Sequence, residues 1–235
     1  MSSTKSTTID STSSRLELLN TNLVVLLLII QIVLTGVLVY RIFRVEKLVS
    51  QTGKINEIQS NEIKFVPNIK TEGYPTKGPE NAQITIIEFG DYQCVYCKQA
   101  EDIINQLFQN HPGQIKLVFR DYPIPSHPYS IDAAEAAACA ADQGMFWEMH
   151  DALFEQQDQI TSTFLPQLAS DLGLNMNQWN ACMSSHQHKE AIQADAMEGA
   201  ALGVTGTPNF FVNGYLLPFA GNLMDFENLI AKNTN

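Results

Sequence analysis

The chain is long enough to bury one hydrophobic core, and its charge is unevenly distributed. Its 235 residues, 45% of them hydrophobic and 9% aromatic, suit one folded domain with some tens of residues left for an anchor or a linker. The formal net charge is -11, and residues 70–235 hold 20 acidic and 7 basic side chains, whereas residues 1–69 hold 5 and 7. A C-terminal part this acidic repels phosphate backbones, which excludes nucleic acid from the expected partners.

The N-terminal part combines a polar tail with an apolar segment. Residues 1–22 are rich in Ser and Thr, so we expect a disordered tail. Residues 23–43, uncharged from Leu23 to Tyr40, have the length of about 20 residues that a helix needs to cross a bilayer. A cleaved signal peptide and a buried core helix are the alternatives, but no small-x-small cleavage site follows and the run exceeds a signal peptide's apolar region. A single transmembrane helix is predicted.

Residues 44–74 mix charge, Gly and Pro with short apolar groups, which is typical of a stalk between an anchor and a domain. The charges around the predicted span favour a cytoplasmic domain under the positive-inside bias. The basic residues are Lys5 and Arg15 before the span and Arg41, Arg44, Lys47 and Lys54 after it.

The pattern from residue 83 onward predicts a strand, a helix and a second strand. Residues 83–90 are rich in Ile and Phe, residues 98–110 have apolar side chains at helical spacing, and residues 114–123 again suit a strand. Cys94 and Cys97 lie where the first strand gives way to the helix. The sequence therefore predicts a βαβ unit with two cysteines at its first turn.

The position of these cysteines indicates redox chemistry. A thiolate at a helix N-terminus is stabilised by backbone N–H groups, which lowers its pKa from about 8.5 into the range of about 3.5 to 7.5. We therefore interpret Cys94 as the nucleophile and the more shielded Cys97 as the resolving thiol. A structural disulfide would close too small a loop to stabilise the fold much. A zinc site would need further ligands, for which Cys182, His186 and His188 are the candidates.

Three stretches resemble one family: IIEFGDYQCVYC, then VFRDYPIPSHPYSIDAAEAAACAADQGMFWEMHDALF, and ALGVTGTPNFFVNG. They are similar to the DsbA-like branch of the thioredoxin superfamily, whose members are extracytoplasmic thiol–disulfide oxidoreductases. The resemblance covers about residues 75–232. It implies an α/β thioredoxin fold over residues 75–235 with a helical insertion at about 128–200. Within the insertion, residues 130–143, 145–156, 165–173 and 178–203 are predicted to be successive helices.

The resemblance also implies roles for single residues. Thr207 and Pro208 match the family's cis-proline turn beside the reactive cysteines, and Glu88 matches an acidic residue that can exchange a proton with Cys97. Cys139 and Cys182 are expected to form a structural disulfide, as in several relatives, and two buried free thiols are the alternative. The insertion's His127 matches an HP step of the family. The dithiol itself replaces any bound cofactor or metal in this prediction.

The predicted function is a membrane-anchored oxidoreductase that forms or exchanges disulfides in extracytoplasmic proteins. Two departures leave its direction open: Val95 stands where many relatives carry Pro, and Tyr96 stands where the more oxidising members often carry His. Tyr cannot offer Cys94 a cationic partner, so we expect a milder oxidant. A reductase or isomerase using the same pair is the first alternative, and a tethered holdase is the second. The expected partners are cysteine-containing protein substrates and a membrane protein, linked to quinone, that recycles the dithiol.

The predicted location is the outer face of the cell membrane, with a short inner tail. A reducing cytosol would keep an oxidising pair reduced and would disfavour the Cys139–Cys182 bridge. We give this argument more weight than the flanking charges, because long domains are translocated largely regardless of charge.

Overall fold

The computed structural model describes residues 28–47, 64–217 and 221–233, which belong to two separate units, Met1–Asn61 and Glu62–Asn235. The described part of the first unit is a helix, Leu28–Lys47, with a mean hydropathy of 1.9. Its length and composition would allow it to cross a membrane. The predicted tail (1–22), the start of the predicted span and residues 48–63 of the predicted stalk lie outside the described residues.

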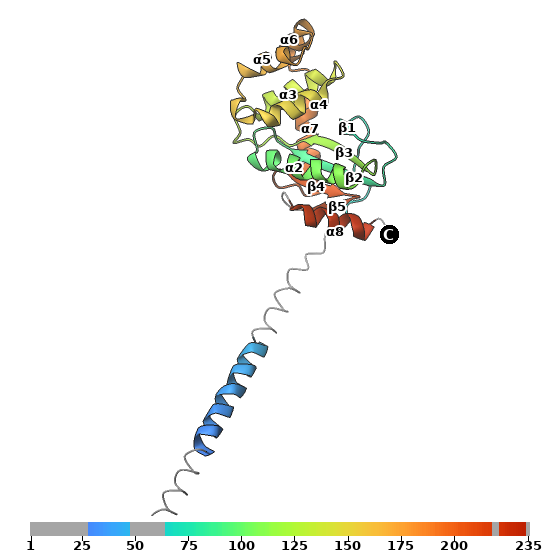
Figure 1. Cartoon of the computed structure of the whole chain (residues 1–235). Helices are drawn as coiled ribbons and strands as arrows, with labels where there is room; N and C mark the ends of the chain where they lie inside the picture. The colour runs from blue at the N-terminus through green and yellow to red at the C-terminus, as the bar shows by residue number, and fades with distance from the viewer. Residues whose placement is uncertain (1–27, 48–63, 218–220, 234–235) are drawn as a thin grey trace, which may run out of the picture. The chain divides into compact units, whose positions relative to one another are not determined.

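The second unit is built on one mixed five-stranded sheet with the strand order β1-β3-β2-β4-β5 (Figure 1). The central strands β2 and β3 run parallel, whereas β1 pairs antiparallel with β3, and β4 pairs antiparallel with both β2 and β5. The strands are β1 (Thr76–Lys77), β2 (Ile84–Gly90), β3 (Ile115–Asp121), β4 (Asn209–Val212) and β5 (Tyr215–Leu217). The β2-helix-β3 unit predicted from the sequence is present.

Helices cover the sheet, and a group of helices forms one end of the domain. Figure 1 shows α3 to α6 gathered at one end of the domain, with α8 at the other. Between β3 and β4 the chain forms a run of helices that ends at Leu202. The helices are α2 (Val95–Asn110), α3 (Ser130–Ala141), α4 (Phe146–Glu155), the short 3-10 helix η1 (Gln157–Gln159), α5 (Phe164–Asp171), α6 (Met176–Ser185), α7 (Lys189–Leu202) and α8 (Leu223–Asn233).

Each face of the sheet has its own core, because successive side chains of a strand point to opposite faces. On one face, apolar side chains of β2, β3 and β4 pack against α2 and α8. On the other face, Phe89 and Phe211 pack with Val204 and with the segment that precedes β1. Glu88 has the same parity as Ile84 and Ile86, so it faces α2. This register places an acidic side chain beneath the start of that helix.

The structure divides the last of the four predicted helical stretches into two helices. We predicted one helix over residues 178–203, but α6 ends at Ser185 and α7 begins at Lys189. His186 between them has a φ of 51°, in the left-handed region that ends a helix. Its Nδ1 lies 2.8 Å from a carboxylate oxygen of the buried Glu135, an interaction across 51 positions that local periodicity cannot reveal.

The folded unit begins earlier than the predicted stalk boundary at residue 74. The Val66 N–H donates to the Gly214 carbonyl at 2.8 Å, and Phe65 forms a β-bridge with Tyr215. The Lys64 ammonium donates to the Leu202 carbonyl at 2.8 Å, at the end of α7. Residues 64–74 are therefore part of the domain rather than of a linker, because residues 64–66 bond to β5, to its turn and to the end of α7, and Val66, Ile69 and Tyr74 pack against the core.

A disulfide joins Cys139 of α3 to Cys182 of α6, with the Cα atoms 5.9 Å apart. Both cysteines are buried within the apolar cluster of the helical insertion. The bridge uses the Cys182 sulfur, so this residue cannot supply the thiolate of a zinc site with His186 and His188.

Candidate active site

Cys94 occupies the N-cap position of α2, and Cys97 lies in its first turn. The backbone N–H groups of Cys97 and Lys98 donate to the Cys94 carbonyl at 3.1 and 3.3 Å, which starts the helix. Both cysteines are free thiols in this structure, and Cys97 is completely buried. The helix therefore places the first sulfur at its positive end and shields the second.

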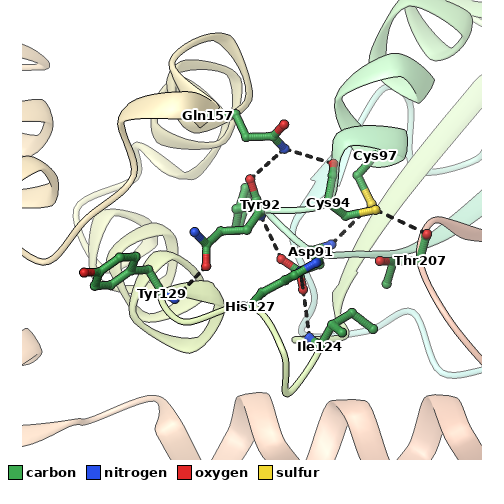
Figure 2. A network of polar contacts seen from close by, with 10 residues as sticks. Asp91, Tyr92, Cys94, Cys97, Ile124, His127, Tyr129, Gln157 and Thr207 are labelled. Atoms are coloured by element: carbon green, nitrogen blue, oxygen red, sulfur yellow. Dashed lines mark hydrogen bonds and ion pairs between the residues drawn. The ribbon is translucent and has the colours of Figure 1, made fainter.

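A cis peptide bond between Thr207 and Pro208 brings the chain before β4 against Cys94. The Cys94 thiol donates to the Thr207 carbonyl oxygen at 3.3 Å (Figure 2). The Thr207 hydroxyl is buried and has no hydrogen-bond partner in the described part of the chain. The structure thus brings together four of the five catalytic candidates from two distant stretches: Cys94, Cys97, Thr207 and Pro208.

The pKa values of the two thiols are shifted in opposite directions. A hydrogen bond from Cys97 is the largest influence on the Cys94 thiol. Together with the N–H groups of Cys97 and Tyr96 it lowers the Cys94 pKa to about 5, although burial opposes the shift. For Cys97, burial is the largest cause, and it raises the pKa well above the usual value. At neutral pH the pair therefore holds one thiolate and one thiol, which differ as nucleophiles.

We expect the ultraviolet thiolate absorbance of the reduced protein to rise in two steps. The first step should lie near pH 5 and belong to Cys94, and the second should lie above the usual thiol range and belong to Cys97. Because the folded-state pKa of Cys94 is lowered, its thiolate stabilises the reduced form fully above the unfolded-state pKa of about 9. This stabilisation is lost as the pH falls through 9 toward 5. Cys94→Ser should remove the low-pH step, and a first step near pH 9 in the unaltered chain would contradict the assignment.

Glu88, the fifth candidate, is fully buried on β2 below the start of α2. Neither of its carboxylate oxygens has a hydrogen-bond partner among the described residues. Burial first, and then the charges of Glu101 and Cys94, raise its pKa well above the ordinary value. A Cβ at Gly90 would lie 2.5 Å from a ring carbon of Phe119 and 3.3 Å from Glu88 Oε1, so this close packing requires glycine.

Asp91 organises the loop that carries Cys94. Its backbone N–H donates to Cys97 Sγ at 3.5 Å, and its carboxylate accepts the N–H groups of Gln93 and Ile124, both at 2.7 Å. The same carboxylate lies 2.8 Å from His127 Nδ1 (Figure 2). The sequence predicted His127 at the start of the insertion. In the structure, its contact with Asp91 links the insertion to the loop that carries Cys94.

Gln157 of η1 joins the insertion to the same loop from the other side. Its Nε2 donates to the Tyr92 carbonyl at 2.8 Å and to the Cys94 carbonyl at 2.9 Å (Figure 2). Gln157 is buried, so these two bonds are shielded from water. Gln157 could not be predicted from the sequence, because a lone Gln after an amphipathic helix carries no motif.

We expect Gln157→Ala to lower both stability and exchange rate. The change leaves the buried Tyr92 carbonyl without its partner, which costs about 1 to 3 kcal/mol, whereas the Cys94 carbonyl keeps the N–H groups of Cys97 and Lys98. The loop should also hold Cys94 less firmly against Thr207. Denaturant unfolding and the rate of peptide oxidation measure the two effects. Gln159→Ala, at an exposed position of the same 3-10 helix, is the matched control and should change neither quantity.

Residues 70–232 match the thioredoxin family model, which covers more than half of the chain. A thioredoxin-like oxidoreductase from Silicibacter pomeroyi shares 27% identity at a TM-score of 0.60, covering 68% of this chain and 92% of that one. The thiol–disulfide exchange protein alpha-DsbA2 from Wolbachia pipientis shares 25% identity at a TM-score of 0.61, covering 68% and 87%. BdbD from Bacillus subtilis shares the fold at 23% identity, with a TM-score of 0.65 and coverage of 70% and 95%. The predicted thioredoxin fold is confirmed.

Curated relatives include Na(+)/H(+) antiporters, which are longer than this chain. The Na(+)/H(+) antiporter NhaA 3 of Salinispora tropica is 37% identical over 139 residues, which are 59% of this chain and 21% of the antiporter. NhaA 1 of Salinispora arenicola is 40% identical over 140 residues, with 59% and 21% coverage. The chain therefore spans about a fifth of the length of these relatives.

Proposed function

Because this chain belongs to the thioredoxin family, we propose that it is a thiol–disulfide oxidoreductase whose reactive pair is Cys94 and Cys97. One observation carries the proposal: the Cys94 sulfur, whose pKa is lowered to about 5, lies at a helix N-terminus, with a buried partner thiol one turn on and the carbonyl of Thr207, the residue before the cis proline, at 3.3 Å. A holdase would not need two thiols of such different acidity.

In the oxidising direction, a substrate thiolate attacks Cys94 Sγ in the Cys94–Cys97 disulfide. The sulfur–sulfur bond breaks, a mixed disulfide forms, and Cys97 leaves with the bonding electron pair. A second substrate thiolate then attacks the substrate sulfur and releases Cys94 as a thiolate. The substrate loses two electrons, and the Cys94–Cys97 pair gains them. The Thr207 backbone, next to Cys94, is the surface along which an extended substrate would bind.

Glu88 supplies the proton in this scheme. A departing Cys97 thiolate is unstable in its buried position, since burial raises the pKa of this thiol. Burial also raises the pKa of Glu88, which favours a protonated carboxyl that can give Cys97 a proton. In the reducing direction the carboxylate would take that proton back as Cys97 attacks the mixed disulfide.

The acidity of Cys94 supports an oxidant of intermediate strength. A stable thiolate favours the reduced pair and so makes the disulfide more oxidising. A pKa of about 5 lies between about 3.5 for the strong oxidant DsbA and about 7 for thioredoxin. Equilibration of the full chain with glutathione, read by thiol alkylation, tests the direction. A potential above about -200 mV would support the oxidase, and one near -270 mV would support the reductase.

The first test of the activity itself is simple. The oxidised chain should convert a reduced dithiol peptide into its disulfide, and the reduced chain should reduce insulin. If neither reaction exceeds the rate without protein while unfolded chains still bind, the holdase alternative would replace the enzyme.

We further propose that the helix Leu28–Lys47 anchors the domain to a membrane, on whose outer face a membrane protein recycles the dithiol. The hydropathy of the helix and the similarity to ion antiporters support a membrane location, and the Cys139–Cys182 bridge supports an oxidising compartment. A membrane-impermeant thiol reagent, applied to intact cells after gentle reduction, should label Cys94. Labelling that occurs only after lysis would place the domain inside the cell and favour the reductase.

A further inference from the structure

The Cys139–Cys182 disulfide lies beside a cavity at the surface of the helical insertion. Both cysteines line this cavity of about 650 Å³, as do Gln178, Ser185 and Gln187. The two cysteines are buried, so the cavity shields them from bulk solvent while leaving a path to their sulfurs. Such an entry path is one of the requirements of a metal site.

A histidine and a carboxylate lie next to the same two sulfurs. A ring nitrogen of His188 and the sulfurs of Cys139 and Cys182 all lie within 4.8 Å of one another. A carboxylate oxygen of Asp142 lies 2.8 Å from His188 Nε2 and 3.7 Å from Cys182 Sγ. Cys139 belongs to α3, and Asp142 lies at the C-terminal end of that helix. Cys182 belongs to α6 and His188 immediately precedes α7, so three helices bring four potential metal ligands together.

Two thiolates, an imidazole and a carboxylate are a set of ligands that favours zinc. In a tetrahedral site, bonds of about 2.0 to 2.3 Å place neighbouring ligand atoms roughly 3.3 to 3.8 Å apart. The two sulfurs can separate to this spacing by rotation about their own Cα–Cβ bonds, because the Cα atoms of Cys139 and Cys182 are 5.9 Å apart. His186, a ligand candidate from the sequence, contacts Glu135 at 2.8 Å and does not belong to this set.

Contacts outside the disulfide hold the ligands near each other. Trp179 Nε1 donates to the Ala136 carbonyl at 3.3 Å, which joins α6 to α3 independently of the bridge. Gln187 Nε2 donates to the Asp142 carboxylate at 3.1 Å, and a secondary hydrogen bond of this kind orients a metal ligand. Opening of the disulfide should therefore leave the four ligands close together.

We propose that the reduced chain binds one zinc ion through Cys139, Cys182, His188 and Asp142, and that closure of the disulfide releases this ion. A newly synthesised chain carries both cysteines as thiols, so the form that binds zinc precedes the bridge. Each thiol passes its proton to water or to a buffer base as its sulfur binds the metal. The closed bridge and the zinc ion exclude each other, because both use the same two sulfurs.

Closure requires an oxidant, for which a disulfide such as oxidised glutathione is sufficient. One sulfur of the pair attacks this disulfide and displaces one glutathione, and the second sulfur then displaces the other to form the Cys139–Cys182 bond. The two cysteines lose two electrons, which the two glutathione molecules gain, and these molecules take up two protons from the solvent. The metal leaves as Zn²⁺, and Asp142 and His188 make the 2.8 Å contact of the closed form.

Zinc titration of the full-length chain tests the site. The double variant Cys94→Ser with Cys97→Ala leaves Cys139 and Cys182 as the only thiols of the chain. After reduction by a phosphine, this variant should take one zinc ion per chain from a competing chelator dye, and with the bridge closed it should take none. Cobalt(II) in place of zinc should show the absorption of a tetrahedral ion with thiolate ligands. The proposal is wrong if the reduced and closed forms bind equal amounts of zinc.

Single substitutions in the reduced double variant identify the other ligands. His188→Ala should weaken zinc binding about tenfold or more, because even the residues that only orient metal ligands have effects of this size. Asp142→Asn should weaken it as well. Gln178→Ala is the matched control, since this exposed residue lines the same cavity and is not a ligand, and it should keep the full affinity. Equal affinities of His188→Ala and Gln178→Ala would contradict the proposed site.

Urea unfolding gives a second readout, which serves even if the reduced chain is only marginally stable. Zinc should raise the unfolding midpoint of the reduced chain and leave that of the closed chain unchanged, because only the reduced form offers the site. Oxidised glutathione should then release one zinc ion for each molecule consumed. An unchanged midpoint, or zinc retained after the bridge has closed, would disprove the proposal. None of these readouts involves disulfide exchange at Cys94 and Cys97, so the proposed function is tested separately.

Discussion

Cys94→Ser should abolish disulfide exchange, whereas Cys97→Ala should convert the protein into a trap for its substrates. Cys94 is the attacking, attacked or leaving sulfur in every step, so no slower route remains without it. When the Cys94 thiolate attacks a substrate disulfide, Cys97 is needed only to resolve the product, so its loss leaves the mixed disulfide between Cys94 and the substrate. After incubation of the reduced variant with a disulfide-bonded peptide, non-reducing gels and intact-mass measurement should show the adduct as the major species.

Two variants frame this result. The double variant Cys94→Ser with Cys97→Ala should form no adduct, which shows that the trapped sulfur is Cys94. Cys97→Ala should also keep a reactive thiolate, although with a raised pKa, because the hydrogen bond from Cys97 is the largest cause of the low Cys94 pKa. Release of substrate by Cys97→Ala at the rate of the unaltered chain would overturn the assigned roles.

Removal of the Cys139–Cys182 disulfide should lower the free energy of unfolding by about 4 kcal/mol. The bridge spans 43 residues, and a loop of that length restricts the unfolded chain by roughly this amount. The paired change Cys139→Ala and Cys182→Ala, followed by urea unfolding with Cys94 and Cys97 kept reduced, measures the loss. The exchange rate of the folded variant should stay within about twofold, because the bridge joins α3 to α6 and contacts neither thiol.

Chemical reduction of the disulfide in the unaltered chain provides the control for this stability measurement. The alanine variant also contains small cavities. The unaltered chain should therefore be unfolded twice, once with the Cys139–Cys182 bridge intact and once after complete reduction of the bridge. Equal unfolding midpoints in the two states would mean that the bridge does not stabilise the fold. A loss confined to the alanine variant would instead identify the cavities as the cause.

Much of the site could be predicted because its signals are local. The spacing of Cys94 and Cys97, the apolar strand before them and the amphipathic helix after them occur within 30 residues and reflect the periodicities of the backbone. Thr207 and Pro208 needed the family resemblance, since a lone Thr-Pro step has many meanings. Even with that resemblance, the sequence could not place Gln157.

The missed features depend on contacts between distant residues. Arg120 lies on β3. A charged residue is usually exposed, yet Arg120 is fully buried and paired with Asp195 of α7, 75 positions away. The break at His186 depends in the same way on Glu135 of α3. Such pairs satisfy buried polar groups, and only the assembled fold shows which groups are near each other.

The hydrogen bonds of Gln157 have a consequence for the evolution of this enzyme. Both bonds end on main-chain carbonyls, which every amino acid at positions 92 and 94 would provide. Val95 and Tyr96, between the two cysteines, are 54% and 60% exposed and take no part in this attachment. Substitutions at Val95 and Tyr96 can therefore change the redox potential, while Gln157 still holds the loop in place and the domain keeps its stability. Gln157 itself has no such freedom, because the bonds need its amide.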